Sequence, residues 1–502
     1  MSGERNFRFA AKEEIQNRPK LIRPFLFRIL SYLKPYLFKI ILALMIIVVI
    51  AVLDVLPATL SGRIIDEGFI QKDFHLLLTL IFLSITIMVI SSLLSVFENY
   101  LNIWVSQHIV KDMKNEMYMH LQQMSQRFFT TNKQGDIITR MTSDITGAQA
   151  VISNTLTSTV SNIAILITSM MAMIQKNWLL SLVGISILPL FILPTKLVGK
   201  KRWKLTLNSQ IKRDKMNQIL DETLSVSGQN LVKVFANEEQ EYQRYAKTNE
   251  EILKLNIEES MAGRWFRMTI GTFTNMGPMF IYLIGGIVIL KMNVTSLTVG
   301  DVTVMVTLLT RMYRPVSSLL NIQVDFFRGM ALFTRIFEYL DMSIEIQNKP
   351  NAKELTSIIE ALEFKGVCFG YTQDQQVLNQ LSFTVPKKSM TAIVGSSGSG
   401  KTTLINLLLR LYDVNEGSIE IDGVDIREIN IKSLRKNIGI VTQESYLFNG
   451  TIRENLLYAK ADATEEELIH VCEEVNIAKL ISSLPDGLDT VVGNRGVKLS
   501  GG

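Results

Sequence analysis

The chain has 502 residues, of which 47% are hydrophobic and 20% charged, and its formal net charge at pH 7 is +5. Its mean hydropathy of +0.23 is too high for an ordinary soluble enzyme, and its length allows two or three domains. Lys and Arg are spread along the chain rather than gathered beside aromatic residues, which argues against a nucleic-acid partner. Cys368 and Cys472 lack the spacing of a zinc site or of a disulfide framework.

Six long apolar runs predict a domain that spans a lipid bilayer. Residues 76–97 contain no charged side chain and would extend about 33 Å as a helix, enough to cross a hydrocarbon core. The other runs lie at about 36–57, 151–174, 178–198, 268–290 and 297–320. Before the first run, residues 21–34 mix Leu, Ile and Phe with Arg and Lys, which predicts a helix lying at the cytoplasmic interface.

The distribution of basic residues predicts the orientation of these spans. Lys and Arg concentrate in the loops at about 101–150 and 199–264, which places both loops and both termini in the cytoplasm. Within the first loop, apolar residues such as Met113 and Met117 recur every three or four positions, as in a helix with one packed face. We therefore expect the membrane helices to continue into the cytoplasm and to turn near residues 130–136 and Ser227-Gly228.

Near residues 348–355 the long apolar runs give way to short alternating ones, which marks a domain boundary. Beyond it, the short apolar run TAIVG predicts a strand that leads into a glycine-rich loop, which matches GxxxxGK[ST] and is followed by a helical pattern. Glycines allow successive N–H groups to face phosphates, Lys401 can reach the β- and γ-phosphates, and the Thr402 hydroxyl can bind Mg²⁺. The predicted loop comprises Gly395, Ser396, Ser397, Gly398, Ser399, Gly400, Lys401, Thr402 and Thr403.

Two further residues flank this loop in the predicted sheet. Gln443 follows an apolar run that predicts a strand, at the edge where open α/β sheets bind ligands. Tyr371 follows another predicted strand and offers an aromatic face to a purine ring. Taken alone, Gln443 is more typical of a surface loop and Tyr371 of ordinary packing.

The order of these features carries a resemblance to a known family. Six spans are followed by FGY (369–371), GSSGSGKTT (395–403), VTQESYLF (441–448), TVVGNRG (490–496) and LSGG (499–502). In this order they resemble the motifs of bacterial ABC exporter half-transporters of the multidrug and lipid type. The stretches FFTTNKQGDIITRMTSD (128–144) and SGQNLVKVFANEE (227–239) are similar to the coupling regions of that family.

The resemblance implies a fold class of two parts: an α-helical membrane domain with six long transmembrane helices, and an α/β P-loop nucleotide-binding domain. It implies an N-terminal tail and elbow at 1–35, the membrane domain at 36–340, a linker at 341–360 and the nucleotide-binding domain at 361–502. ATP and Mg²⁺ are the implied cofactors, with Tyr371 as adenine platform and with Thr402 and Gln443 near Mg²⁺ or the attacking water. The signature residues Leu499, Ser500, Gly501 and Gly502 would cap ATP held by a second half-transporter, in a homodimer or heterodimer in the cell membrane.

The sequence also departs from the family pattern. The catalytic Glu and the switch His that should follow LSGG are absent from these 502 residues. We therefore expect a nucleotide-binding domain that is truncated at the signature motif, destabilised and unable to hydrolyse ATP efficiently. Export of an amphipathic or lipophilic compound is the leading function, and a nucleotide-sensing regulatory membrane protein without ATP turnover is the alternative.

Two arginines in the last span are candidates for contact with the transported substrate. Ionisable groups inside a span are costly, so Arg311 or Arg314 could face a central cavity and meet an anionic or amphipathic compound. The competing interpretation is that both snorkel to the inner interface. In the fifth span, the Gly277-Pro278 pair predicts an interruption of the helical hydrogen bonds.

Overall fold

The computed structural model describes residues 23–186, 192–291, 297–357, 360–372, 375–442 and 446–492. The chain divides into two compact units, Met1–Glu345 and Ile346–Gly502. We call them the helical unit and the C-terminal unit, and describe each by itself.

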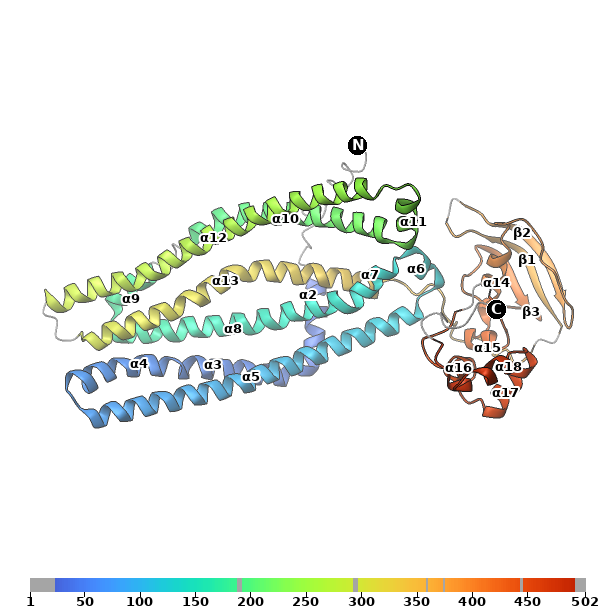
Figure 1. Ribbon diagram of the computed structural model, residues 1–502. Helices are drawn as coiled ribbons and strands as arrows, with labels where there is room; N and C mark the ends of the chain where they lie inside the picture. Colours follow the sequence, from blue (N-terminus) through green and yellow to red (C-terminus); the bar gives the residue numbers. More distant parts are fainter. Residues whose placement is uncertain are drawn as a thin grey trace. The chain divides into compact units, whose positions relative to one another are not determined.

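The helical unit is built from long helices that run side by side (Figure 1). It begins with α2 (Arg23–Leu33), a helix at the position where the sequence predicts an interfacial one. The following elements are η1 (Lys34–Tyr36), α3 (Leu37–Leu53), α4 (Val55–Arg63), η2 (Ile64–Ile70), α5 (Phe74–Gln123), α6 (Gln126–Thr131), α7 (Gln134–Thr139), η3 (Arg140–Asp144), α8 (Ile145–Lys176), α9 (Trp178–Ser186), α10 (Ile192–Leu224), α11 (Val226–Val234), α12 (Glu238–Leu290) and α13 (Val299–Leu340).

Among the described residues, four helical stretches are long and apolar enough to cross a membrane. They are Phe27–Ile70, Phe74–Gln123, Gln134–Lys176 and Glu238–Leu290, and they contain the first, second, third and fifth predicted spans. The fourth predicted span includes residues 187–191, which lie outside the described residues. The sixth lies in α13, which is 42 residues long but is not one of these four stretches.

The predicted extension of the helices beyond the membrane is confirmed. Helix α5 has 50 residues and α12 has 53. At 1.5 Å per residue each is about 75–80 Å long, more than twice the thickness of a hydrocarbon core. The two predicted turns are short helices: α6 and α7 form what we call the first tip (residues 126–139), and α11 forms the second tip. Both tips lie at the same end of the helical unit (Figure 1).

Local chemistry explains the second tip. Ser225 is the N-cap of α11 and accepts a hydrogen bond from the backbone N–H of Gly228, with 3.0 Å between Oγ and N. A Cβ at Gly228 would lie 1.8 Å from the carbonyl oxygen of Glu222. Only glycine therefore permits this tight reversal between α10 and α11.

The Gly277-Pro278 pair does not end the helix, because α12 continues through Pro278. Proline has no backbone N–H, so one helical hydrogen bond is still absent at this position. A Cβ on Gly277 would lie 1.7 Å from the hydroxyl oxygen of Tyr313 in α13. This glycine serves close helix packing, next to a core that includes Met305 and Leu308 of α13, both fully buried.

The C-terminal unit contains a four-stranded antiparallel sheet in the order β2-β1-β3-β4. Its strands are β1 (Ala361–Phe369), β2 (Leu378–Pro386), β3 (Glu416–Ile421) and β4 (Val424–Asp425). The helical elements are α14 (Lys401–Leu408), η5 (Ile426–Glu428), α15 (Ile431–Lys436), α16 (Ile452–Leu457), α17 (Glu465–Glu474), α18 (Ala478–Ser483) and η6 (Gly487–Asp489). One core joins the sheet to α14, with Val367, Phe369, Leu407 and Leu434 all fully buried.

Two predicted strands of this unit are wrong. Residues 390–395, before the glycine-rich loop, and residues 438–442, before Gln443, form no strand. Val394 is 88% exposed and Val441 is 100% exposed. A parallel strand gains stability from hydrogen-bonded neighbours and from helices covering both faces, and the described residues supply neither to these two segments.

Candidate nucleotide-binding site

The glycine-rich loop leads directly into α14. Gly398 and Gly400 have φ angles of +80° and +91°, a left-handed conformation that glycine adopts without steric cost. Gly400 is the N-cap of α14, and a Cβ there would lie 2.8 Å from Leu378 of β2. The loop before it, Gly395 to Ser399, is exposed, so its backbone is open to an anion at the positive end of the helix.

Lys401 lies over this loop. Its ammonium donates hydrogen bonds to the backbone carbonyls of Gly395 and Ser396, each with 2.8 Å between Nζ and O. The amine is therefore held at the mouth of the loop, where phosphate oxygens can replace the two carbonyls as acceptors. The neighbouring Thr402 is exposed, so its hydroxyl is accessible to a cation. These donors suit a nucleotide triphosphate with its Mg²⁺.

Tyr371 and Thr403 are 32 positions apart in sequence, and the fold brings them together. The Tyr371 hydroxyl and Thr403 Oγ1 share a hydrogen bond of 3.1 Å. The Tyr371 ring packs edge to face against Tyr412, with 5.2 Å between ring centroids, and against Phe369, with 5.0 Å. Tyr371 remains 39% exposed, so part of its ring is accessible. Sequence reasoning missed Tyr412, whose only signal is its place shortly after α14.

Two family models cover most of the chain. The model described as the ABC transporter transmembrane region matches residues 40–316, and the model described as ABC transporter matches residues 378–502. The chain belongs to the ABC transporters. Its domains and relatives make it an exporter half-transporter, with a transmembrane region and an ATP-binding domain in one polypeptide.

Similar ABC proteins extend over nearly the whole chain. The ATP-dependent lipid A-core flippase of Syntrophus aciditrophicus is 32% identical over 475 residues, covering 95% of this chain and 78% of the flippase. The flippase of the same name from Desulfotalea psychrophila is 32% identical over 472 residues, covering 93% and 81%. The solved structure of a bacterial Atm1-family ABC exporter with ATP bound has a TM-score of 0.72 and 27% identity, covering 92% of this chain and 81% of that one.

In the transmembrane region of this ABC transporter, the two arginines of the last span differ. Arg311 of α13 forms an ion pair with Asp54, at the junction of α3 and α4, with 2.8 Å between Nη2 and Oδ2. Arg311 also donates to the Asp54 carbonyl oxygen, and Ser91 of α5 donates to the Asp54 carboxylate. Arg314 is exposed and has no ion pair within the described part of the chain. Sequence reasoning missed this pairing because Asp54 lies 257 positions from Arg311.

The remaining predicted site residues of the ABC transporter lie outside the described residues. They are Gln443 and the signature residues Leu499, Ser500, Gly501 and Gly502.

Proposed function

We propose that this half-transporter exports a lipid-like, amphipathic compound across the cell membrane and is driven by ATP. The observation that carries the proposal is the exposed glycine-rich loop with Lys401 at its mouth, in the same chain as helices long enough to cross a bilayer. The names of two relatives, ATP-dependent lipid A-core flippases, support a lipid-like substrate.

In this proposal each residue of the ATP-binding domain has a defined contact. Lys401 binds the β- and γ-phosphates, Thr402 binds Mg²⁺, and Tyr371 packs against the adenine. Gln443 meets Mg²⁺ or the attacking water. The signature residues Leu499 to Gly502 cap the ATP of a second half-transporter, in a homodimer or a heterodimer.

We assign substrate contact to Arg314 rather than Arg311. The charge of Arg311 is balanced by Asp54, whereas Arg314 is exposed on the same face of α13 as Thr307 and Thr310. Such a polar stripe is costly against lipid tails but is stable against a water-filled cavity or a partner protomer. An anionic group of the substrate would then pair with the Arg314 guanidinium.

The second tip supports a coupling role in this mechanism. Leu231 and Val234 of this tip and Phe235, its C-cap residue, are 59%, 78% and 66% exposed. The basic loops around both tips predict that the tips and both termini are cytoplasmic, where the membrane cannot cover these apolar side chains. We propose that they contact an ATP-binding domain of the assembled transporter.

The test is export from proteoliposomes that contain a fluorescent anionic lipid and this chain joined beyond Gly502 to a segment that carries the catalytic Glu and the switch His, since the 502 residues alone are not expected to hydrolyse ATP efficiently. ATP with Mg²⁺ should drive export, and Lys401→Ala should abolish both ATP binding and export because the phosphate contact is lost. Arg314→Gln should lower export of the anionic lipid but not of a neutral analogue. Arg267→Gln, at an exposed position of α12, is the matched control.

Binding of ATP without turnover or export would refute transport and favour a nucleotide-sensing membrane protein. Equal loss of the anionic and neutral lipids in Arg314→Gln would refute the substrate contact alone.

A further inference from the structure

The C-terminal end of α13 is held by side chains from segments far away in the sequence. Ile336, Phe337 and Tyr339 are at most 3% exposed. Helix α13 ends at Leu340, and the C-terminal unit begins six positions later at Ile346. Whatever fixes the end of α13 therefore fixes the point from which the chain leaves the helical unit.

Tyr339 joins α13 to the first tip. Its ring packs edge to face on Phe128 of α6, with 5.3 Å between centroids and 81° between ring planes. The Arg140 guanidinium of η3 lies 3.8 Å from the centroid of the same ring, and it donates to Glu338 with 3.1 Å between Nη2 and Oε2. A planar cation that stacks on an aromatic ring and bonds a carboxylate has little freedom to move.

Phe337 joins α13 to α2 in the same way. The Arg28 guanidinium lies 4.2 Å from the Phe337 ring centroid and forms an ion pair with Asp341, the C-cap of α13. The Tyr32 ring stacks on Phe337, with 6.4 Å between centroids, and its hydroxyl donates to Glu116 of α5 at 2.6 Å.

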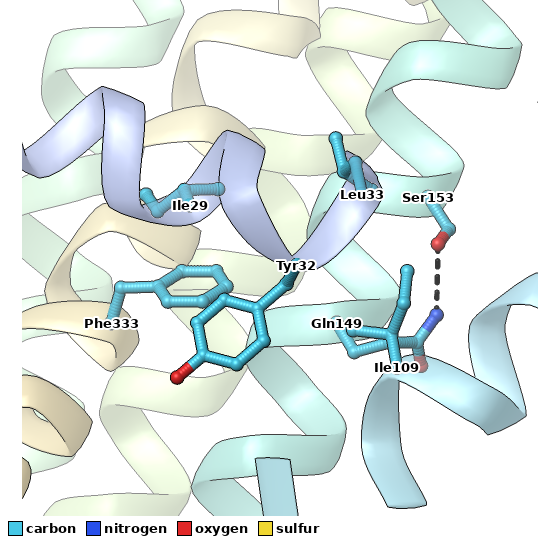
Figure 2. Close-up of a pocket in the computed structure, with 7 residues that line it drawn as sticks. All are labelled: Ile29, Tyr32, Leu33, Ile109, Gln149, Ser153 and Phe333. Carbon is cyan, nitrogen blue, oxygen red and sulfur yellow. Dashed lines mark hydrogen bonds between the residues drawn. The ribbon is translucent and has the colours of Figure 1, made fainter. Parts of the chain in front are cut away.

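Near Phe337, helix α2 packs against three other helices: α5, α8 and α13. Figure 2 shows Ile29, Tyr32 and Leu33 of α2 against Phe333 of α13, with Ile109 of α5 below them. Gln149 and Ser153 of α8 close the same small cavity and are linked by a hydrogen bond of 2.9 Å (Figure 2). The volume open to the centre of a water molecule is about 10 Å³, roughly the room for one water molecule.

Two further polar contacts hold the chain just before and just after the end of α13. Arg335 pairs with the buried carboxylate of Asp144, with 3.4 Å between Nε and Oδ2. After the helix ends, the hydroxyl of Ser125, the N-cap residue just before the first tip, donates to the Glu345 carboxylate at 2.9 Å. From position 335 to 345, the chain is therefore tied repeatedly to the first tip and its flanks.

We propose that Arg28, Phe128, Arg140, Phe337 and Tyr339 form a clamp that makes the first tip and the end of α13 move as one rigid body. They are positioning residues for coupling, because force received by the first tip then reaches the start of the C-terminal unit without loss. The inference rests on the proposed ATP-driven export for its purpose, but its rigid-body claim does not depend on transport.

The rigid-body claim is tested by electron–electron distance measurements on the full chain. Spin labels are placed at Gln134→Cys in the first tip and Ala331→Cys in α13, both exposed positions, whereas the native Cys368 and Cys472 are buried. We expect one narrow distance distribution that is unchanged by ATP with Mg²⁺, and a broadened one after Arg140→Gln. A nucleotide-dependent distance in the chain with an intact clamp would overturn the proposal.

The coupling role is tested with Arg140→Gln and Tyr339→Leu in the proteoliposomes described above, which contain the catalytic Glu and the switch His. The phosphate loop is untouched, so KM for ATP should stay within about twofold, while lipid exported per ATP hydrolysed falls by about fivefold or more. Tyr339→Phe keeps the ring and should retain coupling even if Tyr339→Leu fails to fold. Lys254→Gln, which removes an exposed ion pair with Glu250, is the control.

The outcomes separate the two proposals. If the unaltered chain exports nothing, the proposed function fails and the distance measurement still decides the clamp. If the unaltered chain exports lipid and the clamp variants export as much per ATP, the clamp fails and the proposed function stands.

Discussion

The ion pair between Asp54 and Arg311 predicts a specific pattern of stability changes. It joins α3 and α4 to α13, and Ser91 adds α5 through its hydrogen bond to the Asp54 carboxylate. Asp54→Asn keeps the size and the hydrogen-bonding capacity of this side chain but leaves the Arg311 charge unbalanced. Arg311→Met leaves the Asp54 charge unbalanced instead.

The expected magnitude follows from the burial of the two groups. Loss of a hydrogen bond to a charged group costs about 1.5–3 kcal/mol when the site is buried. The Arg311 and Asp54 side chains are 23% and 37% exposed, so solvent screening lowers our expectation to about 1–2 kcal/mol for each single variant. For a unit of 345 residues, that corresponds to a drop of about 1.5–3 °C in apparent melting temperature.

The assay is a double-mutant cycle followed by thermal unfolding in detergent. Once one partner is gone, removal of the other should cost little, so the double variant should lose clearly less than the sum of the two single losses. Arg314→Gln is the control and should change the melting temperature by less than about 1 °C, because surface substitutions usually have small effects. Single variants as stable as the unaltered chain, or losses that simply add, would refute the reasoning.

Three further substitutions test local features of the fold. Gly277→Ala should destabilise the helical unit by about 1–3 kcal/mol because its Cβ would overlap the Tyr313 hydroxyl, and adding Tyr313→Phe should restore part of the loss in the same melting assay. Gly228→Ala should disturb the second tip, seen as faster proteolysis there, whereas normal cleavage would contradict the tight turn. Tyr371→Phe removes the hydrogen bond to Thr403 and should lower stability by about 0.5–1.5 kcal/mol while ATP affinity, measured by calorimetry, changes less than threefold.

The helical unit could be read from the sequence in large part because its signals are local. Runs of about 20 apolar residues determine where helices cross a membrane, and a three-to-four-residue apolar period determines that α5 continues beyond it. The contacts within the unit were not predictable in the same way. Nothing near Arg311 indicates Asp54, and nothing near Tyr339 indicates Phe128, because helix packing alone brings them together.

In the C-terminal unit, local sequence signals predicted some features correctly and others wrongly. The glycine-rich loop and a helix directly after it were predicted, because glycine spacing and an apolar helical period are local signals. The strands expected at 390–395 and 438–442 were not found, although their composition favours strands. A strand is stable only when a neighbouring strand pairs with it. A strand-favouring composition therefore forms a strand only where the rest of the fold supplies that neighbour.

A last prediction concerns how α13 moves with its neighbour. A Cβ at Gly329 of α13 would lie 2.5 Å from the Cγ1 atom of Val151 in α8, so these two helices touch at a glycine between Arg314 and the clamp. Gly329→Ala should force α13 away from α8 and lower lipid exported per ATP, and adding Val151→Ala should restore it by making room. Gly286→Ala in α12 is the control, since among the described residues its added Cβ would meet nothing within 4 Å beyond its chain neighbours and its own helix backbone. Because alanine favours a helix over glycine by about 1 kcal/mol, a loss in Gly329→Ala cannot come from helix propensity. If Gly329→Ala exports as efficiently as the unaltered chain, close contact with α8 is not what transmits movement along α13.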